Sequence, residues 1–293
     1  MRLAAAGVDS PRLDAELLLA HVLGRTRTYL FAHPERRLQP GETEQFAALV
    51  ERRVRREPLP YLLGRWEFLG LSFRVGPGVL IPRPETECLV EAVAARARPA
   101  ARALEVGAGS GCIAIGLAHL RPDLHIVTLE PDRQAAEIAE SNVGLLGVAA
   151  RVQVIQARFP DALDNPPVPA TTGEIARNAS EAPSCLPGLW DVLVSNPPYI
   201  PTPDLAALQP EVRGYEPRAA LDGGADGLLL VRALIHRGPQ CLAPGGLLAL
   251  EIGLGQEAPV DAMLSVDVRW GEVMILPDLA GIPRVVLAVL RQA

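Results

Sequence analysis

The sequence predicts an α/β fold, a doubly wound and mainly parallel sheet preceded by a small N-terminal helical domain. After about residue 75, short apolar runs alternate with helix-like stretches, the pattern of strands joined by crossover helices. The charge balance changes at the same place. Residues 1–75 hold 12 arginines against nine acidic residues, whereas residues 76–293 hold 16 against 25. We therefore expect two domains, 1–75 and 76–293.

Two helices are expected in the N-terminal domain. Ser10 and Pro11 combine an N-cap residue with proline at the first helical position, and Gly24 can end that helix. The second helix begins near Gly41 and ends in a run of arginines. The run is either a solvated face that complements the helix C-terminus or a docking patch for an acidic or RNA-bound partner. The expected inward residues are Leu13, Leu17 and Ala20 on the first helix and Phe46, Leu49, Val50 and Val54 on the second; the run is Arg52, Arg53, Arg55 and Arg56.

A hairpin and an alternating series of strands and helices are expected next. Apolar and polar residues partly alternate around glycines within residues 66–80, which predicts a hairpin linking the two domains. Residues 164–189 are rich in Pro, Ala, Ser and Thr and predict a flexible surface insertion. The expected strands are 103–106, 126–130, 152–155, 191–195, 247–252, 273–276 and 285–290, with helices at 111–120, 133–146 and 227–242.

The composition excludes several kinds of chemistry. All 28 basic residues are arginine, so Schiff-base formation, a P-loop lysine and a lysine general base are excluded. The five histidines show no metal-ligand spacing, and we expect no metal site. The four cysteines form no C-x-x-C pair, which favours free thiols in a reducing compartment. No signal peptide and no apolar run of about 18 residues is present, so we expect a soluble, cytoplasmic protein.

A buried strand that ends in a glycine-rich turn marks the first candidate site. Such a turn brings backbone close to a ligand at the carboxyl end of a sheet. Glu130 ends the next expected strand, 23 residues after the first glycine, where an acid can accept hydrogen bonds from both ribose hydroxyls. Cys112 stands where a dinucleotide-binding turn has a glycine, which favours S-adenosylmethionine over NAD. The turn consists of Gly107, Ala108, Gly109, Ser110 and Gly111.

A second candidate site, Asn196-Pro197-Pro198-Tyr199, follows the strand expected at 191–195. Its two prolines fix φ and remove two backbone donors, so the segment cannot continue strand pairing. The Asn196 side-chain oxygen and the Pro197 carbonyl remain as acceptors beside an aromatic ring. These acceptors suit an N–H₂ group held in one plane. A structural turn capped by Asn196 is the alternative interpretation.

With the glycine turn and Glu130, the N-P-P-Y tetrapeptide resembles the class I methyltransferases that act on planar nitrogens. The rest of the chain resembles the protein-glutamine methyltransferases of the HemK/PrmC type, which modify peptide chain release factors. The similarity covers nearly the whole chain, with the motifs in the same order. These motifs are Arg56–Gly64, Trp66–Phe68, Val79–Glu87, Asp222–Leu228, Leu248–Gly253, Asp278–Gly281 and Arg284–Val286.

The resemblance implies a Rossmann-like methyltransferase fold with S-adenosyl-L-methionine as cofactor. By position, the turn from Gly107 to Gly111 would contact the methionine part of the cofactor and Glu130 its ribose. Arg158 stands where a residue of the family often contacts the cofactor. It follows Ala157, which replaces the acid that the family usually has near the adenine.

The resemblance also implies the roles of the second site. Asn196 and Pro197 would be the catalytic residues that orient the acceptor amide, with Asn196 also near the cofactor. Pro198 and Tyr199 would shape the substrate pocket. The implied reaction is methylation of the glutamine amide nitrogen in the Gly-Gly-Gln motif of release factors, and the N-terminal helices would bind the rest of that partner.

Three alternatives remain. The substrate could be a ribosomal-protein glutamine, or the chain could be a non-catalytic, cofactor-binding partner of the translation machinery. A nucleic-acid adenine methyltransferase could use the same tetrapeptide, since its exocyclic N–H₂ is also planar. Direct nucleic-acid binding is not expected, because the catalytic domain carries a net charge of −9 and no lysine.

Overall fold

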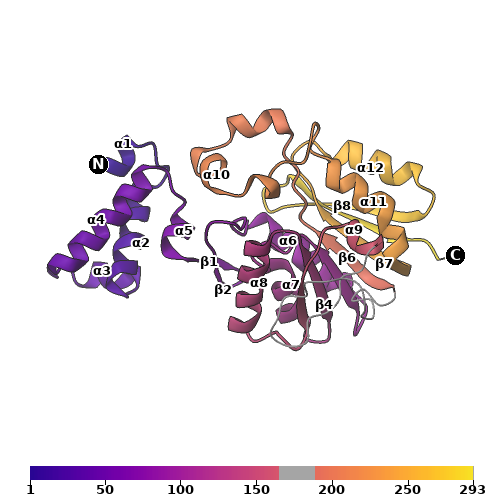
Figure 1. Ribbon diagram of the computed structural model, residues 1–293, viewed down its shortest axis with the longest axis horizontal. Helices are drawn as coiled ribbons and strands as arrows, with labels where there is room; N and C mark the ends of the chain where they lie inside the picture. The colour runs from indigo at the N-terminus through magenta and orange to yellow at the C-terminus, as the bar shows by residue number, and fades with distance from the viewer. Residues whose placement is uncertain (165–188, 293) are drawn as a thin grey trace.

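The larger, C-terminal part of the molecule is built around a central sheet (Figure 1). This sheet has seven strands in the order β5-β4-β3-β6-β7-β9-β8. The computed structural model describes residues 1–164 and 189–292, so the predicted insertion at 164–189 lies outside the described residues except for its two ends. Strands β3 to β7 pair in parallel, and β9 pairs antiparallel with β7 and β8. The predicted doubly wound, mainly parallel sheet is confirmed. The strands are β3 (Arg102–Val106), β4 (His125–Glu130), β5 (Val152–Gln156), β6 (Trp190–Ser195), β7 (Leu242–Glu251), β8 (Trp270–Pro277) and β9 (Pro283–Leu290).

Helices cover both faces of the sheet because successive strand residues point to opposite sides. On β6, Val192 and Val194 pack with one apolar cluster, and Leu193 between them packs with the other. The first cluster includes α6 (Glu85–Arg96), α7 (Cys112–Leu120) and α8 (Arg133–Leu145), and the second includes α9 (Asp161–Asp164), α11 (Leu229–Cys241) and α12 (Glu257–Val266). A further segment between β6 and α11 holds η1 (Thr202–Ala207), α10 (Pro210–Tyr215) and η2 (Arg218–Ala220).

The N-terminal helices lie to one side of the sheet and have a small core of their own (Figure 1). Gly24 ends α2 in the left-handed conformation, as expected. Ser10 is its N-cap residue, but its side chain makes no capping hydrogen bond. The predicted inward face of α2 is partly wrong, because Leu13 is exposed and Leu18 is the fully buried residue. The helices are α1 (Arg2–Ala5), α2 (Pro11–Leu23), α3 (Arg27–Ala32), α4 (Pro40–Val54) and α5 (Leu59–Leu63).

The predicted hairpin consists of β1 (Arg65–Phe68) and β2 (Leu71–Arg74). Its turn, Leu69 and Gly70, has positive φ at both residues, the geometry that suits a two-residue hairpin. Phe68 and Phe73 are buried in the cluster of α6, α7 and α8. The hairpin therefore holds the N-terminal helices to the helical layer of the sheet.

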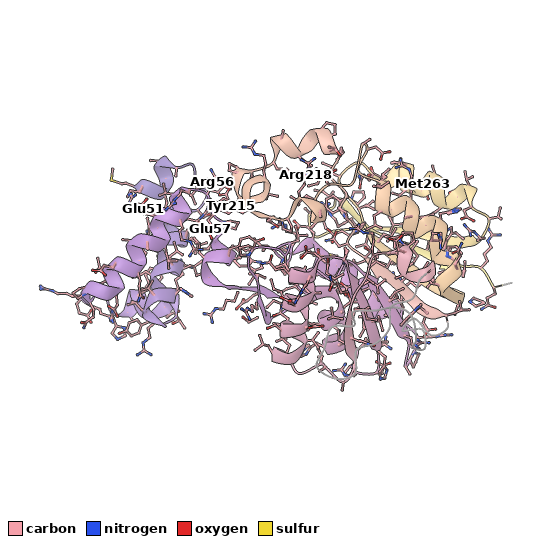
Figure 2. All side chains as sticks on the ribbon, viewed as in Figure 1. Glu51, Arg56, Glu57, Tyr215, Arg218 and Met263 are labelled. Atoms are coloured by element: carbon pink, nitrogen blue, oxygen red, sulfur yellow. The ribbon has the colours of Figure 1, made fainter. Side chains whose placement is uncertain are left out.

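The arginine run at the end of α4 makes ion pairs within the chain. For Arg53 and Arg56, both predicted interpretations, a solvated face and a docking patch for a partner, are therefore wrong. Arg53 is buried, with its Nε 2.7 Å from Asp14 Oδ2 and its Nη1 2.9 Å from Glu211 Oε1 of α10. Arg56 contacts both carboxylate oxygens of Glu211, at 2.6 and 2.5 Å. The Tyr215 hydroxyl donates to the Arg55 carbonyl at 2.7 Å. These bonds join the N-terminal helices to α10, and Figure 2 shows Arg56 and Tyr215 at this junction.

Within the part of the chain that the structure describes, no helix is long and apolar enough to cross a membrane.

Candidate functional site

The two candidate loops lie side by side at the carboxyl edge of the sheet. The glycine turn follows β3 and the N-P-P-Y segment follows β6, and these strands are parallel neighbours. The strand that follows β3 in the chain, β4, lies on its other side. Ligands of open α/β sheets bind at such a switch point in strand order. The Ser195 hydroxyl donates to the Val106 carbonyl at 2.6 Å, which ties the two strand ends together.

The glycine turn is held against the end of β4. The amides of Gly107 and Ala108 both donate to the Leu129 carbonyl, at 2.8 and 3.1 Å. Gly107 and Gly109 have φ values of +87° and +53°, and a Cβ on either would meet no protein atom within 4 Å. The two glycines therefore border open space, where a ligand can approach the backbone.

The other two members of the turn have packing roles. A Cβ on Gly111 would lie 3.1 Å from Ile115 Cδ1, so this glycine allows α7 to begin close to its neighbours. Ser110 is buried, and its carbonyl accepts a hydrogen bond from Asn142 Nδ2 at 2.8 Å. Asn142 also exchanges hydrogen bonds with the Arg74 backbone of the hairpin.

Glu130 lies at the end of β4, where the sequence predicted a ribose acceptor. Its two carboxylate oxygens accept the amides of Gly109 and Asp132, at 2.9 and 3.0 Å. Burial raises the pKa of Glu130, although both amides and the nearby Arg158 guanidinium oppose that shift. Arg158 itself is exposed just after β5. The carboxylate keeps further lone pairs for two hydroxyl groups.

The N-P-P-Y segment leaves the sheet beside α6 and the end of β7. Asn196 is half-buried, and its Nδ2 donates to Thr86 Oγ1 at 3.1 Å. The Thr86 hydroxyl donates to Glu251 Oε2 at 2.7 Å, and the Tyr199 hydroxyl lies 3.4 Å from Glu251 Oε1. In the described part of the chain, no group donates a hydrogen bond to the Asn196 side-chain oxygen or to the Pro197 carbonyl. Both acceptors are therefore unpaired within the described residues, Asn196 being half-buried and Pro197 buried.

Burial shifts the pKa of two groups beside Asn196. It raises the pKa of Glu251 to about 7, and the nearby Glu85 charge adds to the shift while Thr86, Arg284 and Tyr199 oppose it. Burial also raises the pKa of Tyr199 to about 12. Near neutral pH the site thus holds a neutral phenol and a carboxyl group poised between its two protonation states.

The loop Asp222–Leu228, which precedes α11, packs against the backbone of the N-P-P-Y segment. A Cβ on Gly223 would lie 2.6 Å from the Pro198 carbonyl oxygen, and one on Gly227 only 2.2 Å from the Tyr199 carbonyl oxygen. Gln256 Nε2 donates to the same Tyr199 carbonyl at 2.9 Å. Only glycine permits this approach of two backbones, because any side chain there would collide with a carbonyl.

Sequence reasoning assigned no separate role to Thr86, Glu251, Gly223, Gly227 or Gln256. The first four lie within motifs that carried the resemblance, but nothing in the spacing placed them beside Asn196. Gln256 had no signal of any kind. Their positions depend on β7 and α6 meeting the β6 loop in three dimensions.

Comparison with known proteins identifies the family. A model of the PrmC N-terminal domain matches residues 1–64, and a precorrin methyltransferase domain model matches residues 89–173. The release factor glutamine methyltransferase of Geobacter sulfurreducens is 43% identical over 286 residues, 97% of this chain and 91% of that protein. The chain belongs to the release factor glutamine methyltransferase family.

A second family member confirms how fully the chain matches. The release factor glutamine methyltransferase of Moorella thermoacetica is 42% identical over 294 residues, 99% of this chain and 95% of that protein. The fold is shared more widely. The crystal structure of a methyltransferase from Pyrococcus furiosus has a TM-score of 0.50 at 17% identity, covering 86% of this chain and 99% of its own. The resemblance found in the sequence is therefore confirmed for both fold and family.

Proposed function

We propose that this protein transfers the methyl group of S-adenosyl-L-methionine to the side-chain amide nitrogen of the glutamine in the Gly-Gly-Gln motif of peptide chain release factors. Family membership supports the reaction class. The observation that carries the proposal is the pair of unpaired acceptors, Asn196 Oδ1 and the Pro197 carbonyl, beside the glycine turn on the neighbouring strand.

The residues of the glycine turn fit the cofactor. The open space at Gly107 and Gly109 would admit its methionine part, and Glu130 would accept the ribose hydroxyls. Ala108, Ser110 and Gly111 complete the turn and are proposed to belong to the same cofactor site, where Ser110 and Gly111 also contact α8 and α7. Arg158 is exposed near Glu130, a position suited to the adenosine end of the cofactor. When bound, S-adenosylmethionine supplies an electrophilic methyl group on sulfonium sulfur.

Asn196 and Pro197 are the proposed catalytic residues. An amide nitrogen is a poor nucleophile, since its lone pair is delocalised into the carbonyl group. If the two acceptors hold both N–H bonds, they fix the amide plane and direct the nitrogen toward the methyl donor. The nitrogen becomes more positive as the new bond forms, so the acceptors bind the transition state more strongly than the ground state. Pro198 and Tyr199 would line the acceptor pocket.

The partner is proposed to be a protein. Residues 1–75 carry a net positive charge and have an apolar core of their own, which suits a separate recognition domain for the release factor. The acidic remainder is a poor match for a nucleic-acid backbone. We also propose that the protein works in the cytoplasm, and the free thiols of Cys88, Cys112 and Cys241 in the described residues support a reducing compartment.

Peptide mass spectrometry of a release factor incubated with enzyme and S-adenosylmethionine tests the proposal. We expect the mass of one methyl group to be added to the Gly-Gly-Gln peptide. Asn196→Ala should keep cofactor binding and lose most of the turnover. In parallel reactions with labelled cofactor, ribosomes, DNA and RNA are offered separately. Label on a ribosomal protein or nucleic acid but not on the release factor would overturn the assignment, as would full activity of Asn196→Ala.

A further inference from the structure

We propose that Thr86 and Glu251 are positioning residues that fix the orientation of the Asn196 side-chain amide, so that its oxygen and not its nitrogen faces the acceptor substrate. The proposal rests on the proposed function, in which Asn196 accepts a hydrogen bond from the substrate amide.

Three separate elements supply this chain of hydrogen bonds. Thr86 lies in the first turn of α6, Glu251 ends β7, and Asn196 follows β6. Thr86 is 2% exposed and Glu251 is 1% exposed, so neither can exchange its partner for solvent. The Asn196 Nδ2 to Thr86 Oγ1 distance is 3.1 Å, and the Thr86 Oγ1 to Glu251 Oε2 distance is 2.7 Å.

While Glu251 is ionised, the count of protons allows only one direction along this chain of hydrogen bonds. An ionised carboxylate can only accept, so the single hydroxyl proton of Thr86 must be donated to Glu251. Thr86 Oγ1 then has only lone pairs to offer to Asn196. The N–H₂ end of the Asn196 amide can donate to those lone pairs, whereas its oxygen would face them without a proton between. The Asn196 oxygen is therefore turned away from Thr86.

Further contacts hold the Glu251 carboxylate in place. The Tyr199 hydroxyl lies 3.4 Å from its other oxygen, and the charge of Arg284 on β9 also favours the ionised form. Arg284 is itself fixed, since its Nε lies 3.3 Å from Asp278 Oδ2 and its Nη1 donates to the Ile252 carbonyl at 3.0 Å. The orientation of Asn196 is thus determined by the buried Thr86 and Glu251 and by the groups that hold Glu251.

The orientation decides whether the proposed reaction can proceed. A flipped Asn196 would present N–H donors to an acceptor amide that also offers N–H donors, and one of the two holding bonds would be lost. The lost bond is one that strengthens in the transition state, so its absence should lower kcat more than substrate affinity.

Steady-state kinetics on Thr86→Val and Thr86→Ser, with the intact release factor as substrate, test the proposal. Thr86→Val has nearly the same shape but no hydroxyl, and we expect kcat to fall by about 10- to 100-fold. Thr86→Ser restores the hydroxyl and should recover most of the activity. The Kd of S-adenosylhomocysteine should stay unchanged in both variants. Thr128→Val is the matched control, since Thr128 is also fully buried but faces Glu105 on the neighbouring strand rather than Asn196.

The possible results distinguish a positioning role of Thr86 from a role in packing alone and from a role in the cofactor site. Wild-type kcat in Thr86→Val, or equal impairment of the Ser and Val variants, would overturn the positioning role. So would a weakened Kd for S-adenosylhomocysteine in Thr86→Val, because it would assign Thr86 to the cofactor site. Failure of the wild-type protein to methylate the release factor is a separate result, and it would instead remove the proposed function on which the inference depends.

Discussion

Glu105 and Glu251 are two buried carboxyl groups on the face of the sheet that α6 and α7 cover. Glu105 lies in β3 and is fully buried beside Thr128 of β4. Burial raises its pKa to about 8, and that of Glu251 to about 7. Both carboxyl groups should therefore titrate near neutral pH. We expect the titration of Glu251 to affect the activity and that of Glu105 to affect the stability.

The activity should follow the ionisation of Glu251. Once protonated, this carboxyl can donate to Thr86, which frees the Thr86 proton for the Asn196 oxygen and permits the amide to flip. We expect kcat to fall as the pH drops through about 7, and Glu251→Gln to flatten this dependence between about pH 6 and pH 8. Initial rates across that range, at saturating substrates, provide the measurement.

The other titratable and charged groups that face Glu251 restrict which residues could cause the pH dependence of kcat. They are Glu85 from α6, Cys112 from α7, Arg284 from β9 and Tyr199. Burial raises the pKa of Cys112 and of Tyr199 to about 12, so neither titrates in this range. Glu105→Gln is the control, and an unchanged pH profile in Glu251→Gln would count against the mechanism.

Stability should depend on Glu105. A carboxyl whose folded pKa lies above its ordinary value of 4.5 stabilises the fold most at low pH, and this contribution is lost as the pH rises through about 8. We expect Glu105→Gln to be less destabilised than the wild type on going from about pH 5 to about pH 9. Urea unfolding at both pH values checks this. A parallel loss of stability in the two proteins would contradict the expectation.

At the scale of elements, the loop around Gly227 fixes the shape of the N-P-P-Y segment. Gly227 has a φ of +77°, and its added Cβ would lie 2.2 Å from the Tyr199 carbonyl oxygen. We expect Gly227→Ala to displace the Tyr199 backbone and lower kcat by at least about tenfold. Gly255→Ala is a matched control, because Gly255 has a φ of +79° but open space around it. Equal kcat values for the two variants would show that backbone strain alone explains any loss.

The strands and helices of the sheet were predictable because each has a clear apolar pattern. All seven predicted apolar runs are strands, and the three predicted helices lie within two residues of their observed bounds. The start of β7 was missed, since Pro244, Gly245 and Gly246 interrupt the apolar pattern. That strand begins earlier because Leu242 pairs with Trp190, across a register shift in β6.

Side-chain partners were less predictable than elements. The glycine turn, Glu130 and Asn196 could be placed, because each lies at or directly after the end of a strand and these strand ends share one edge of the sheet. The Thr86–Glu251 contact could not, since these residues are 165 positions apart and no periodicity relates them. The ion pairs of the arginine run could not be predicted for the same reason, because Glu211 lies 155 residues from Arg56 in the sequence.

At the scale of the whole molecule, Glu211 connects the N-terminal helices to the segment that follows the N-P-P-Y residues. Burial opposes ionisation of Glu211, but hydrogen bonds from Arg56 and Arg53 outweigh it and lower its pKa. This contribution to stability is present above the ordinary carboxyl pKa and is lost as the pH falls. Glu211 therefore couples the stability of the contact between the N-terminal helices and α10 to pH.

Reversing the charge of Glu211 should weaken the contact between the N-terminal helices and α10. We expect Glu211→Arg to reduce the free energy of unfolding by about 2–4 kcal/mol, because it leaves three arginines together in a partly buried site. Adding Arg56→Glu should recover part of the loss. Urea unfolding measures both, with Glu44→Arg as the control because Glu44 is an exposed acid on α4. A double variant no more stable than Glu211→Arg would contradict the assigned pairing.

The hydrogen bond from Ser195 to the Val106 carbonyl has a thermodynamic consequence for the reaction. It connects the ends of β6 and β3, the strands that carry the N-P-P-Y segment and the glycine turn, in the protein without any ligand. The conformational entropy lost in ordering the two loops is therefore part of the free energy of folding, and it is not lost again in each catalytic cycle. Binding energy from the release factor is then left for aligning the glutamine itself.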